Sequence, residues 1–412
     1  MIGLYSRYKV AIGYTLSSLF RAVTHLAAMF FVSKFVAPAE LGYWTFLLSF
    51  VTYASFMNAG VTNGLSRELP FYLSRNKSDD ALTLVSTAQS YLNACVLITF
   101  LIGIAISIFV GLNHSWIQGI TVFGVALLTM LSLYEGYIIT TYRSNEAFGS
   151  LARIQTIYGV LGFLSIILIY YFGYWGMIMR LIIAQGIFVY LLHLNRPFRV
   201  KSTFSKKALF DLLKVGVPIF LLAYLQNSAA TFDKILLYYK NGNVQLGYYS
   251  FANYGFMAIS MLTVALASYV YPKMTYLYGE SGDKQHLWRF YVKITCFVTA
   301  LMTCIAVVGC LSISFLVDYL FPNYVAAKDL MKLLFIAGAI AGSNIGSNML
   351  WAMKNWVFMS VQQISTAVLL VLCPWLMSII VADTAVGIAY GLIIAYSLSY
   401  LLTVFLAYRS TV

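Results

Sequence analysis

The feature that most limits how this chain can fold is a series of long segments without charged side chains. No Asp, Glu, Lys or Arg occurs between Asp80 and Glu135, a stretch long enough for two helices that each cross a lipid bilayer. Over all 412 residues only 9% are charged, against about 25% in a soluble domain, and 61% are hydrophobic. The sequence therefore predicts an all-α polytopic membrane protein.

Hydropathy predicts about twelve transmembrane helices in this sequence. Each predicted span has roughly 20 or more mainly apolar residues, the length that a helix needs to cross the hydrocarbon core. The predicted spans are 10–36, 41–63, 82–111, 117–141, 151–172, 175–194, 208–239, 246–272, 287–317, 329–353, 358–381 and 385–408.

The two halves of the chain carry matching motifs. Leu246-Gly247-Tyr248-Tyr249-Ser250-Phe251 is a near copy of Leu41-Gly42-Tyr43-Trp44-Thr45-Phe46, and a weaker match pairs 145–155 with 354–363. Matches that recur in the same order indicate an internal repeat rather than chance.

The basic segment 195–207 is the expected linker between the repeats. An even number of predicted spans precedes it, so both halves enter the membrane in the same direction, and such folds place the substrate between the halves. We predict a six-helix bundle over 1–194, a cytoplasmic linker over 195–207 and a second six-helix bundle over 208–412, around a central cavity.

Lys and Arg are concentrated on one predicted side of the membrane. Arg75, Arg143 and the run from Arg196 to Lys207 lie there, and cytoplasmic loops carry such an excess. We therefore expect both termini to be cytoplasmic. The net charge of +13 reflects this bias and indicates contact with anionic membrane lipids, not binding of nucleic acid.

Several short motifs resemble a known family. They are Pro38-Ala39-Glu40-Leu41-Gly42-Tyr43, Gly216-Val217-Pro218, Asp233-Lys234-Ile235-Leu236 and Leu320-Phe321-Pro322-Asn323-Tyr324. Together they are similar to polysaccharide exporters of the multidrug/oligosaccharidyl-lipid/polysaccharide (MOP) superfamily. Length, span number and aromatic content look most like the Wzx-type O-antigen flippases.

This resemblance implies a function and a location. It implies a bacterial inner-membrane flippase that moves an undecaprenyl-diphosphate-linked oligosaccharide, an O-antigen repeat unit, from the cytoplasmic to the periplasmic leaflet by alternating access. H⁺ and Na⁺ are the candidate coupling ions, and no other cofactor or metal is expected. A polymerase and a chain-length regulator are the candidate protein partners.

Charges within the predicted spans are the candidate site residues, because a charge at the centre of a span costs about 2.5–3.5 kcal/mol on insertion scales. Arg21 and His25 lie four residues apart and share a helical face. The Arg21 guanidinium matches diphosphate oxygens in two-pronged hydrogen bonding, and its alternative role is to bind the carbonyls of a neighbouring helix. His25 suits a proton cycle or a structural hydrogen bond.

Three further spans contain isolated charges. By the repeat register Asp233 corresponds to a position on the Arg21–His25 face, so we expect it to oppose Arg21 across the cavity, and its alternative role is to bond within the helix bundle. Lys234 is expected to extend outward toward the interface or to pair elsewhere. Glu135 and Arg180 are predicted to form a pair that stabilises the first half, with direct substrate contact as the alternative.

Two other functions are alternatives to the flippase. A cation-coupled multidrug exporter of the same fold predicts an acidic cavity, whereas Arg21, Arg180 and Lys234 favour an anionic substrate. A membrane-embedded glycan polymerase or ligase requires a large outer loop, and all predicted outer loops are short. We therefore expect a transporter and not an enzyme.

Overall fold

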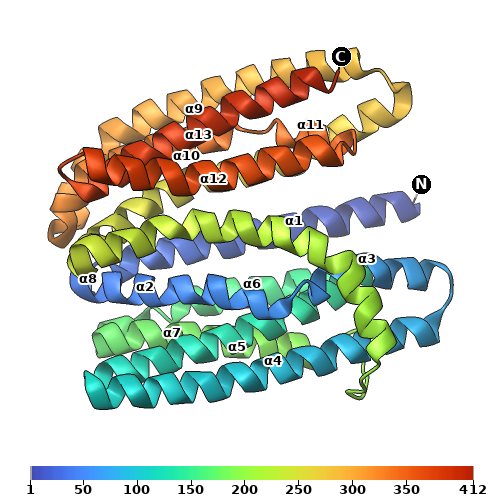
Figure 1. The fold of residues 1–412 in the computed structure, drawn as a ribbon, viewed down its shortest axis with the longest axis horizontal. Coiled ribbons are helices and arrows are strands. Elements are labelled where there is room, and N and C mark those ends of the chain that lie inside the picture. The colour runs from blue at the N-terminus through green and yellow to red at the C-terminus, as the bar shows by residue number, and fades with distance from the viewer. Residues whose placement is uncertain (1, 412) are drawn as a thin grey trace. The chain divides into compact units, whose positions relative to one another are not determined.

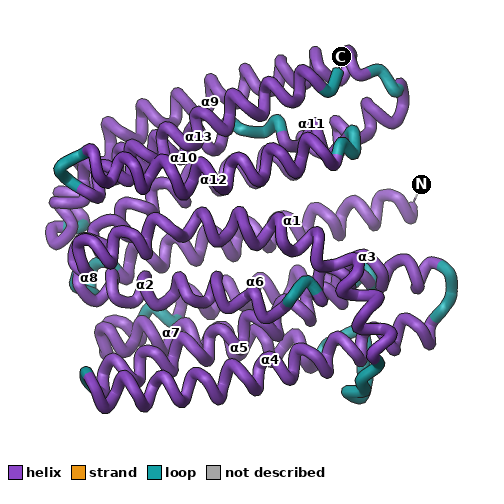
Figure 2. The backbone as a smooth tube through the Cα atoms, viewed as in Figure 1, coloured by secondary structure: helices purple, strands orange, loops and turns teal. Residues whose placement is uncertain are grey.

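The computed structural model describes the backbone of residues 2–411 and the side chains of these residues except 2–12, 264, 265, 268, 269, 272 and 281. The described residues form helices joined by short loops and contain no strand (Figure 2). The elements are α1 (Ile2–Val32), α2 (Pro38–Ala54), η1 (Ser55–Asn58), α3 (Val61–Ser74), α4 (Ser78–Asn113), α5 (Trp116–Ser144), α6 (Phe148–Leu164), α7 (Ile167–Leu194), α8 (Lys206–Ser281), α9 (Lys284–Leu320), η2 (Pro322–Ala327), α10 (Lys328–Ser343), α11 (Ser347–Ala352), α12 (Trp356–Ile380) and α13 (Thr384–Arg409).

These helices account for the twelve predicted spans. Eight helices of the described chain are long and apolar enough to cross a membrane. One of them, α8, contains two predicted spans, and the backbone leaves the helical conformation between them at Gly242, where φ is 76° and ψ is −169°. Gly173 (φ 53°, ψ −126°) interrupts α7 in the same way, between the fifth and sixth predicted spans. Glycine occurs at both breaks because it adopts positive φ without steric cost.

Three predicted spans are divided into shorter helices. The fifth runs from α6 into the start of α7, with the turn 165–166 between them. The second runs through α2, η1 and α3, with a break at Ala59 (φ 46°) and Gly60 (φ 86°). The tenth runs through α10 and α11, which the loop 344–346 separates. The predicted fold class, a polytopic helical membrane protein, is confirmed.

The chain packs as two compact units. Unit 1 consists of Met1–Phe35 and Leu47–Tyr224, and unit 2 of Val36–Phe46 and Leu225–Val412. Helices α2 and α8 therefore each begin in one unit and continue into the other. The predicted bundles 1–194 and 208–412 are defined by counting membrane spans, whereas these units are defined by which residues pack together. The two definitions differ, so the predicted bundle boundaries stay a prediction.

Within unit 1, α1 packs on α6, α4 packs on α5, and α7 packs on both α5 and α6 (Figure 1). A group of buried side chains joins α3, α4 and α5 with the start of α8, and Leu65, Leu92 and Leu212 belong to it. The segment 208–224 is held here, since the Tyr224 hydroxyl donates to the Tyr53 carbonyl oxygen at 3.2 Å.

Within unit 2, α10 packs on α9 and α13, and α12 packs along α13 (Figure 1). Its core includes Met274, Tyr291 and Met302, all buried. The segment 36–46 is fixed by the Phe46 ring, which stacks on Tyr238 with centroids 3.7 Å apart, and by Tyr324, whose hydroxyl donates to the Val36 carbonyl oxygen at 2.9 Å.

The two copies of the Leu-Gly-Tyr motif meet inside unit 2. A Cβ atom added to Gly42 on α2 would lie 1.8 Å from the Asn243 carbonyl oxygen, and one added to Gly247 would lie 1.8 Å from the Pro38 carbonyl oxygen. Only the hydrogen atom that serves as the side chain of glycine fits at these two positions. Small residues of this kind let helix backbones approach closely in membranes. The motif is therefore repeated because each copy forms one side of the same close helix crossing.

The internal repeat is also visible in the loops. Asn76 before α4 and Gly282 before α9 have φ values of 56° and 63°. Glu146 before α6 and Lys354 before α12 have φ values of 53° and 55°, and in both loops the residue that follows donates its N–H to a carbonyl oxygen of the preceding helix. The matches seen in the sequence thus correspond to matched backbone conformations.

Candidate functional site

The central feature of the candidate site is an ion pair inside unit 1. Arg21 lies in the middle of α1, and its Nη1 is 3.4 Å from Oε1 of Glu135 on α5. The side chains are 32% and 18% exposed, so the guanidinium keeps accessible donor groups beside a mostly buried carboxylate. Such a cation is able to accept a second anion without losing all of its protein contacts.

A chain of hydrogen bonds fixes the carboxylate. Gln185 on α7 donates its side-chain amide to Oε2 of Glu135, and its own Oε1 accepts from the Tyr158 hydroxyl of α6 at 2.9 Å. Glu135 is thereby oriented by α7 while it pairs with α1. Gln185 and Tyr158 are not among the site residues predicted from the sequence, although a glutamine within an apolar span is itself an unusual signal.

Two aromatic rings lie beside the guanidinium. The Tyr158 and Phe188 rings stack with centroids 4.5 Å apart, and the Arg21 guanidinium carbon lies 5.8 Å from the centroid of each. Cations are attracted to the faces of such rings, more strongly where water is excluded. Because this attraction needs no counter-charge, it holds the Arg21 guanidinium independently of the ion pair with Glu135.

Arg180 on α7 has a different role from Arg21. It is only 3% exposed, and it donates to the Gly162 carbonyl oxygen at 3.2 Å and to the Ser165 hydroxyl at 3.4 Å. These groups lie at the end of α6, where helix carbonyls lack intrahelical partners and the dipole favours a cation. The ion partner of Glu135 is thus Arg21 rather than the predicted Arg180.

His25 lies one turn beyond Arg21 and is half-buried. Both Arg21 and Arg180 interact with it electrostatically. Arg21, His25, Glu135 and Arg180 therefore belong to one region of unit 1, in which two guanidinium groups outnumber one carboxylate.

Asp233 and Lys234 belong to unit 2. Asp233 is 5% exposed; it accepts from the Tyr249 hydroxyl, which lies beyond the Gly242 break, and from the Lys234 backbone N–H at 2.8 Å. Lys234 is half-buried. Asp233 joins the two parts of α8, and its predicted opposition to Arg21 stays a prediction because the two residues lie in different units.

A small polar pocket lies beside the break between η1 and α3. It measures about 120 Å³, and Ser55, Asn58, Thr62, Thr129 and Ser132 are among its lining residues. Asn58 closes the break by donating to the Thr62 hydroxyl at 2.5 Å and accepting from the Thr62 backbone N–H at 3.1 Å. The space suits a few water molecules, each of which occupies about 30 Å³ in the liquid, and excludes a sugar.

Comparison with known proteins identifies the family. Residues 31–324 match the family model described as "Polysaccharide biosynthesis protein". The chain belongs to this family. The match runs from the end of α1 to η2, so it includes the Gly42–Gly247 crossing and the parts of α5, α6 and α7 that surround Arg21. No curated protein sequence matches the chain.

Solved structures support the same fold. The lipid II flippase MurJ in an inward closed conformation has a TM-score of 0.76 at 14% identity, covering 97% of this chain and 87% of MurJ. An inward-facing MATE multidrug transporter of the MOP superfamily has a TM-score of 0.68 at 16% identity, covering 95% and 94%. The MATE multidrug transporter DinF-BH, solved with a bound ligand, has a TM-score of 0.66 at 17% identity, covering 98% and 95%.

These findings confirm the predicted resemblance to polysaccharide exporters of the MOP superfamily. The protein is a multi-pass membrane protein of a polysaccharide biosynthesis family with the fold of flippases and transporters. The Wzx-type assignment remains a prediction.

Proposed function

We propose that the protein is a flippase for an undecaprenyl-diphosphate-linked oligosaccharide, and that Arg21 binds the diphosphate. The observation that carries this proposal is the partly exposed Arg21, paired with a single carboxylate and bordered by two aromatic rings, in a family of polysaccharide biosynthesis. A planar guanidinium binds two phosphate oxygens at once, which suits it better than a lysine to this task.

In this proposal Glu135 is the resting partner of Arg21. A phosphate that enters the region competes with the carboxylate for the exposed donor groups of the guanidinium, while Gln185 continues to hold Glu135. The substrate is an O-antigen repeat unit that moves from the cytoplasmic to the periplasmic leaflet of the bacterial inner membrane by alternating access. H⁺ or Na⁺ drives the cycle, both termini are cytoplasmic, and the protein performs no covalent chemistry.

Deleting the gene tests this function. We expect lipid-linked repeat units to accumulate on the cytoplasmic side and surface glycan to disappear, and the purified protein to hydrolyse no ATP. Accumulation is measured by extracting the lipid-linked sugars and testing their access to a membrane-impermeant glycosidase. Normal surface glycan in the deletion strain would contradict the proposal.

The second candidate is a cation-coupled multidrug exporter. The likeness in fold to MATE multidrug transporters favours it. The Arg21 region opposes it, because two guanidinium groups against one carboxylate repel a cationic drug. A deletion strain that kept its glycan and lost only resistance to cationic drugs would establish this alternative.

A further inference from the structure

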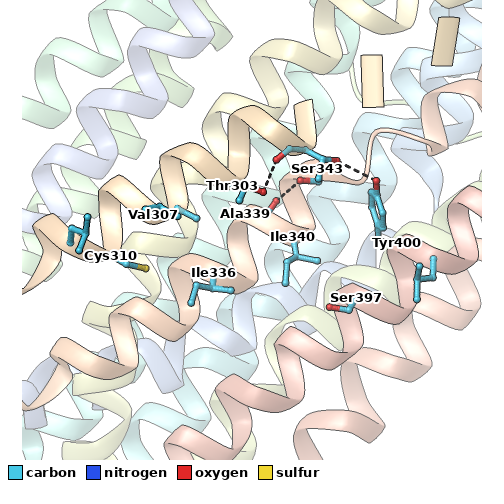
Figure 3. Close-up of a pocket in the computed structure, with 13 residues that line it drawn as sticks. Thr303, Val307, Cys310, Ile336, Ala339, Ile340, Ser343, Ser397 and Tyr400 are labelled. Atoms are coloured by element: carbon cyan, nitrogen blue, oxygen red, sulfur yellow. Dashed lines mark hydrogen bonds between the residues drawn. The ribbon is translucent and has the colours of Figure 1, made fainter. Parts of the chain in front are cut away.

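Unit 2 contains a pocket that the Arg21 proposal does not use. It has a volume of about 630 Å³ and lies where α9, α10 and α13 meet (Figure 3). α9 lines it with a stripe that includes Thr299, Thr303 and Ala306, α10 with residues that include Ala339 and Ser343, and α13 with Ser397 and Tyr400. The volume falls within the roughly 300–1,000 Å³ typical of small-molecule sites.

Small side chains at the helix contacts create this space. Ala306, Ala339 and Ser343 are buried, with at most 8% of each exposed, and they leave open the region that larger side chains would fill. The outer edge is formed by Val307, 55% exposed, and Leu401, 62% exposed. These rim residues are apolar and lie on helices that are long and apolar enough to cross a membrane, so the mouth of the pocket is as apolar as its interior.

The pocket offers a ligand few hydrogen-bonding groups. Thr303 donates to the Thr299 carbonyl oxygen and Ser343 to the Ala339 carbonyl oxygen, each at 2.8 Å, and the Thr299 and Tyr400 hydroxyls lie 3.2 Å apart (Figure 3). None of the lining residues is charged. Sugars, phosphates and cationic drugs would lose their hydration here without replacement, which excludes them. The class of ligand that still fits the pocket is a hydrocarbon chain.

Two kinds of hydrocarbon chain are available in the bilayer. A chain that moves from lipid into an apolar pocket gains nothing from the hydrophobic effect, because lipid tails are as apolar as the protein interior. Its binding depends on close packing and on how little conformational entropy it loses. An isoprenoid chain has a fixed double bond in every five-carbon unit, so it loses less entropy on ordering than a saturated acyl chain does.

We propose that this pocket binds part of the polyisoprenoid chain of the lipid carrier. The proposal rests on the proposed function, which supplies a polyisoprenoid as the lipid. It assigns the hydrocarbon to α9, α10 and α13 of unit 2, a region whose chemistry differs from that of the Arg21 region.

Photo-crosslinking in proteoliposomes tests the proposal. The probes are a polyisoprenyl phosphate with a diazirine on an inner isoprene unit and a phosphatidylcholine with a diazirine on an acyl chain, at equal mole fractions. We expect the isoprenoid probe to label peptides of α9, α10 and α13 about tenfold more than the phospholipid probe. Labelled residues are located by mass spectrometry.

Neighbouring residues of α13 provide matched variants. Ser397→Phe fills the pocket and should reduce isoprenoid labelling to the phospholipid level, whereas Leu398→Phe places the same ring on an exposed, non-lining position and should leave labelling unchanged. Ser397→Leu is the smaller filling variant should Ser397→Phe fail to fold, and melting temperatures identify that case.

Three outcomes would overturn the proposal: equal labelling by both probes, labelling that Ser397→Phe and Ser397→Leu leave intact, or protection by a cationic dye such as ethidium. Labelling measures binding and the deletion strain measures export, so the two proposals fail separately. If the isoprenoid probe labels the protein strongly but deleting its gene leaves surface glycan intact, the pocket proposal stands and the flippase proposal fails.

Discussion

The Arg21 region of unit 1 and the pocket of unit 2 show how two halves with matched backbones take on different chemistry. In unit 1 the meeting point of α1, α5, α6 and α7 is occupied by charged, amide and aromatic groups. In unit 2 the meeting point of α9, α10 and α13 holds small side chains whose hydroxyls bond internally. The two meeting points are not equivalent in the repeat, because the matched loops pair α4 with α9 and α6 with α12. The difference teaches that two halves with matched loop conformations place chemically distinct side chains at different helix contacts.

A smaller contrast appears in the loops that precede α4 and α9. The residue before α4 is Lys77, which makes no capping bond, and the residue before α9 is Asp283, whose carboxylate accepts from the Gln285 and His286 backbone N–H groups at 2.8 and 3.1 Å. The two loops share one backbone feature, a residue with positive φ, which is Asn76 in the first and Gly282 in the second. One copy is therefore stabilised by a side-chain cap that the other lacks.

The largest expected effect is on Arg21. Truncating one partner of a hydrogen-bonded charge pair costs about 2–5 kcal/mol, so Arg21→Ala should reduce export by at least about tenfold. Arg21→Lys should retain part of the activity, because the charge remains but the fork of donors is lost. The measurement is surface glycan in a complemented deletion strain, normalised to the amount of membrane protein. A normal amount of surface glycan with Arg21→Ala would show that Arg21 does not bind the substrate. The difference drawn between the two halves would then be wrong.

Next in size is the helix crossing of unit 2. Gly247→Val must displace the backbone near the Pro38 carbonyl oxygen, and overpacking of this kind costs about 1–3 kcal/mol or more. We expect a lower melting temperature and less protein in the membrane. Gly13→Val is the control, since a Cβ at Gly13 meets nothing within 4 Å. Equal melting temperatures for the two variants would show that the crossing does not need glycine.

Within the charged region, Arg180 is expected to stabilise the fold without taking part in export. Arg180→Ala leaves the end of α6 without its buried donor, and hydrogen bonds to charged groups contribute about 1.5–3 kcal/mol. We therefore expect a lower melting temperature but nearly unchanged export per folded molecule, the reverse of Arg21→Ala. Loss of export at normal stability would place Arg180 in the substrate site instead.

The smallest effect is expected at Asp283. The backbone N–H groups of His286 and Gln285, which donate to its carboxylate, hold the pKa of Asp283 below its ordinary value of 3.8. Because this pKa is lowered by folding, the stabilisation is complete above pH 3.8 and is lost as the pH falls through the folded pKa. Asp283→Ala should lower the melting temperature near pH 7 slightly, and the difference from the natural protein should vanish in acid. Asp283→Asn, a good cap at any pH, should show little change near pH 7.

Sequence reasoning predicted the membrane helices well because hydrophobic length alone decides them. It also identified the motif at Gly42 and Gly247, whose repetition reflects one close contact. It did not predict that Glu135 pairs with Arg21, because that contact depends on the rotation and depth of α1 relative to α5. Such long-range geometry has no periodic signal in the sequence. The same holds for Gln185 and Tyr158, which become evident only once α6 and α7 are placed against Glu135.

The exchange of segments between the two units has a consequence for biosynthesis. Val36–Phe46 belongs to unit 2, yet the ribosome makes it some two hundred residues before its partner Gly247, and unit 1 remains incomplete until 208–224 has been made. At about 5–20 residues per second, the early segment waits on the order of ten seconds or more in the membrane before it can pack. Neither half of the gene, cut at 195–207, encodes a complete unit. The chain must therefore finish folding after most of it has been inserted, and two separately made halves would have to exchange these segments to assemble.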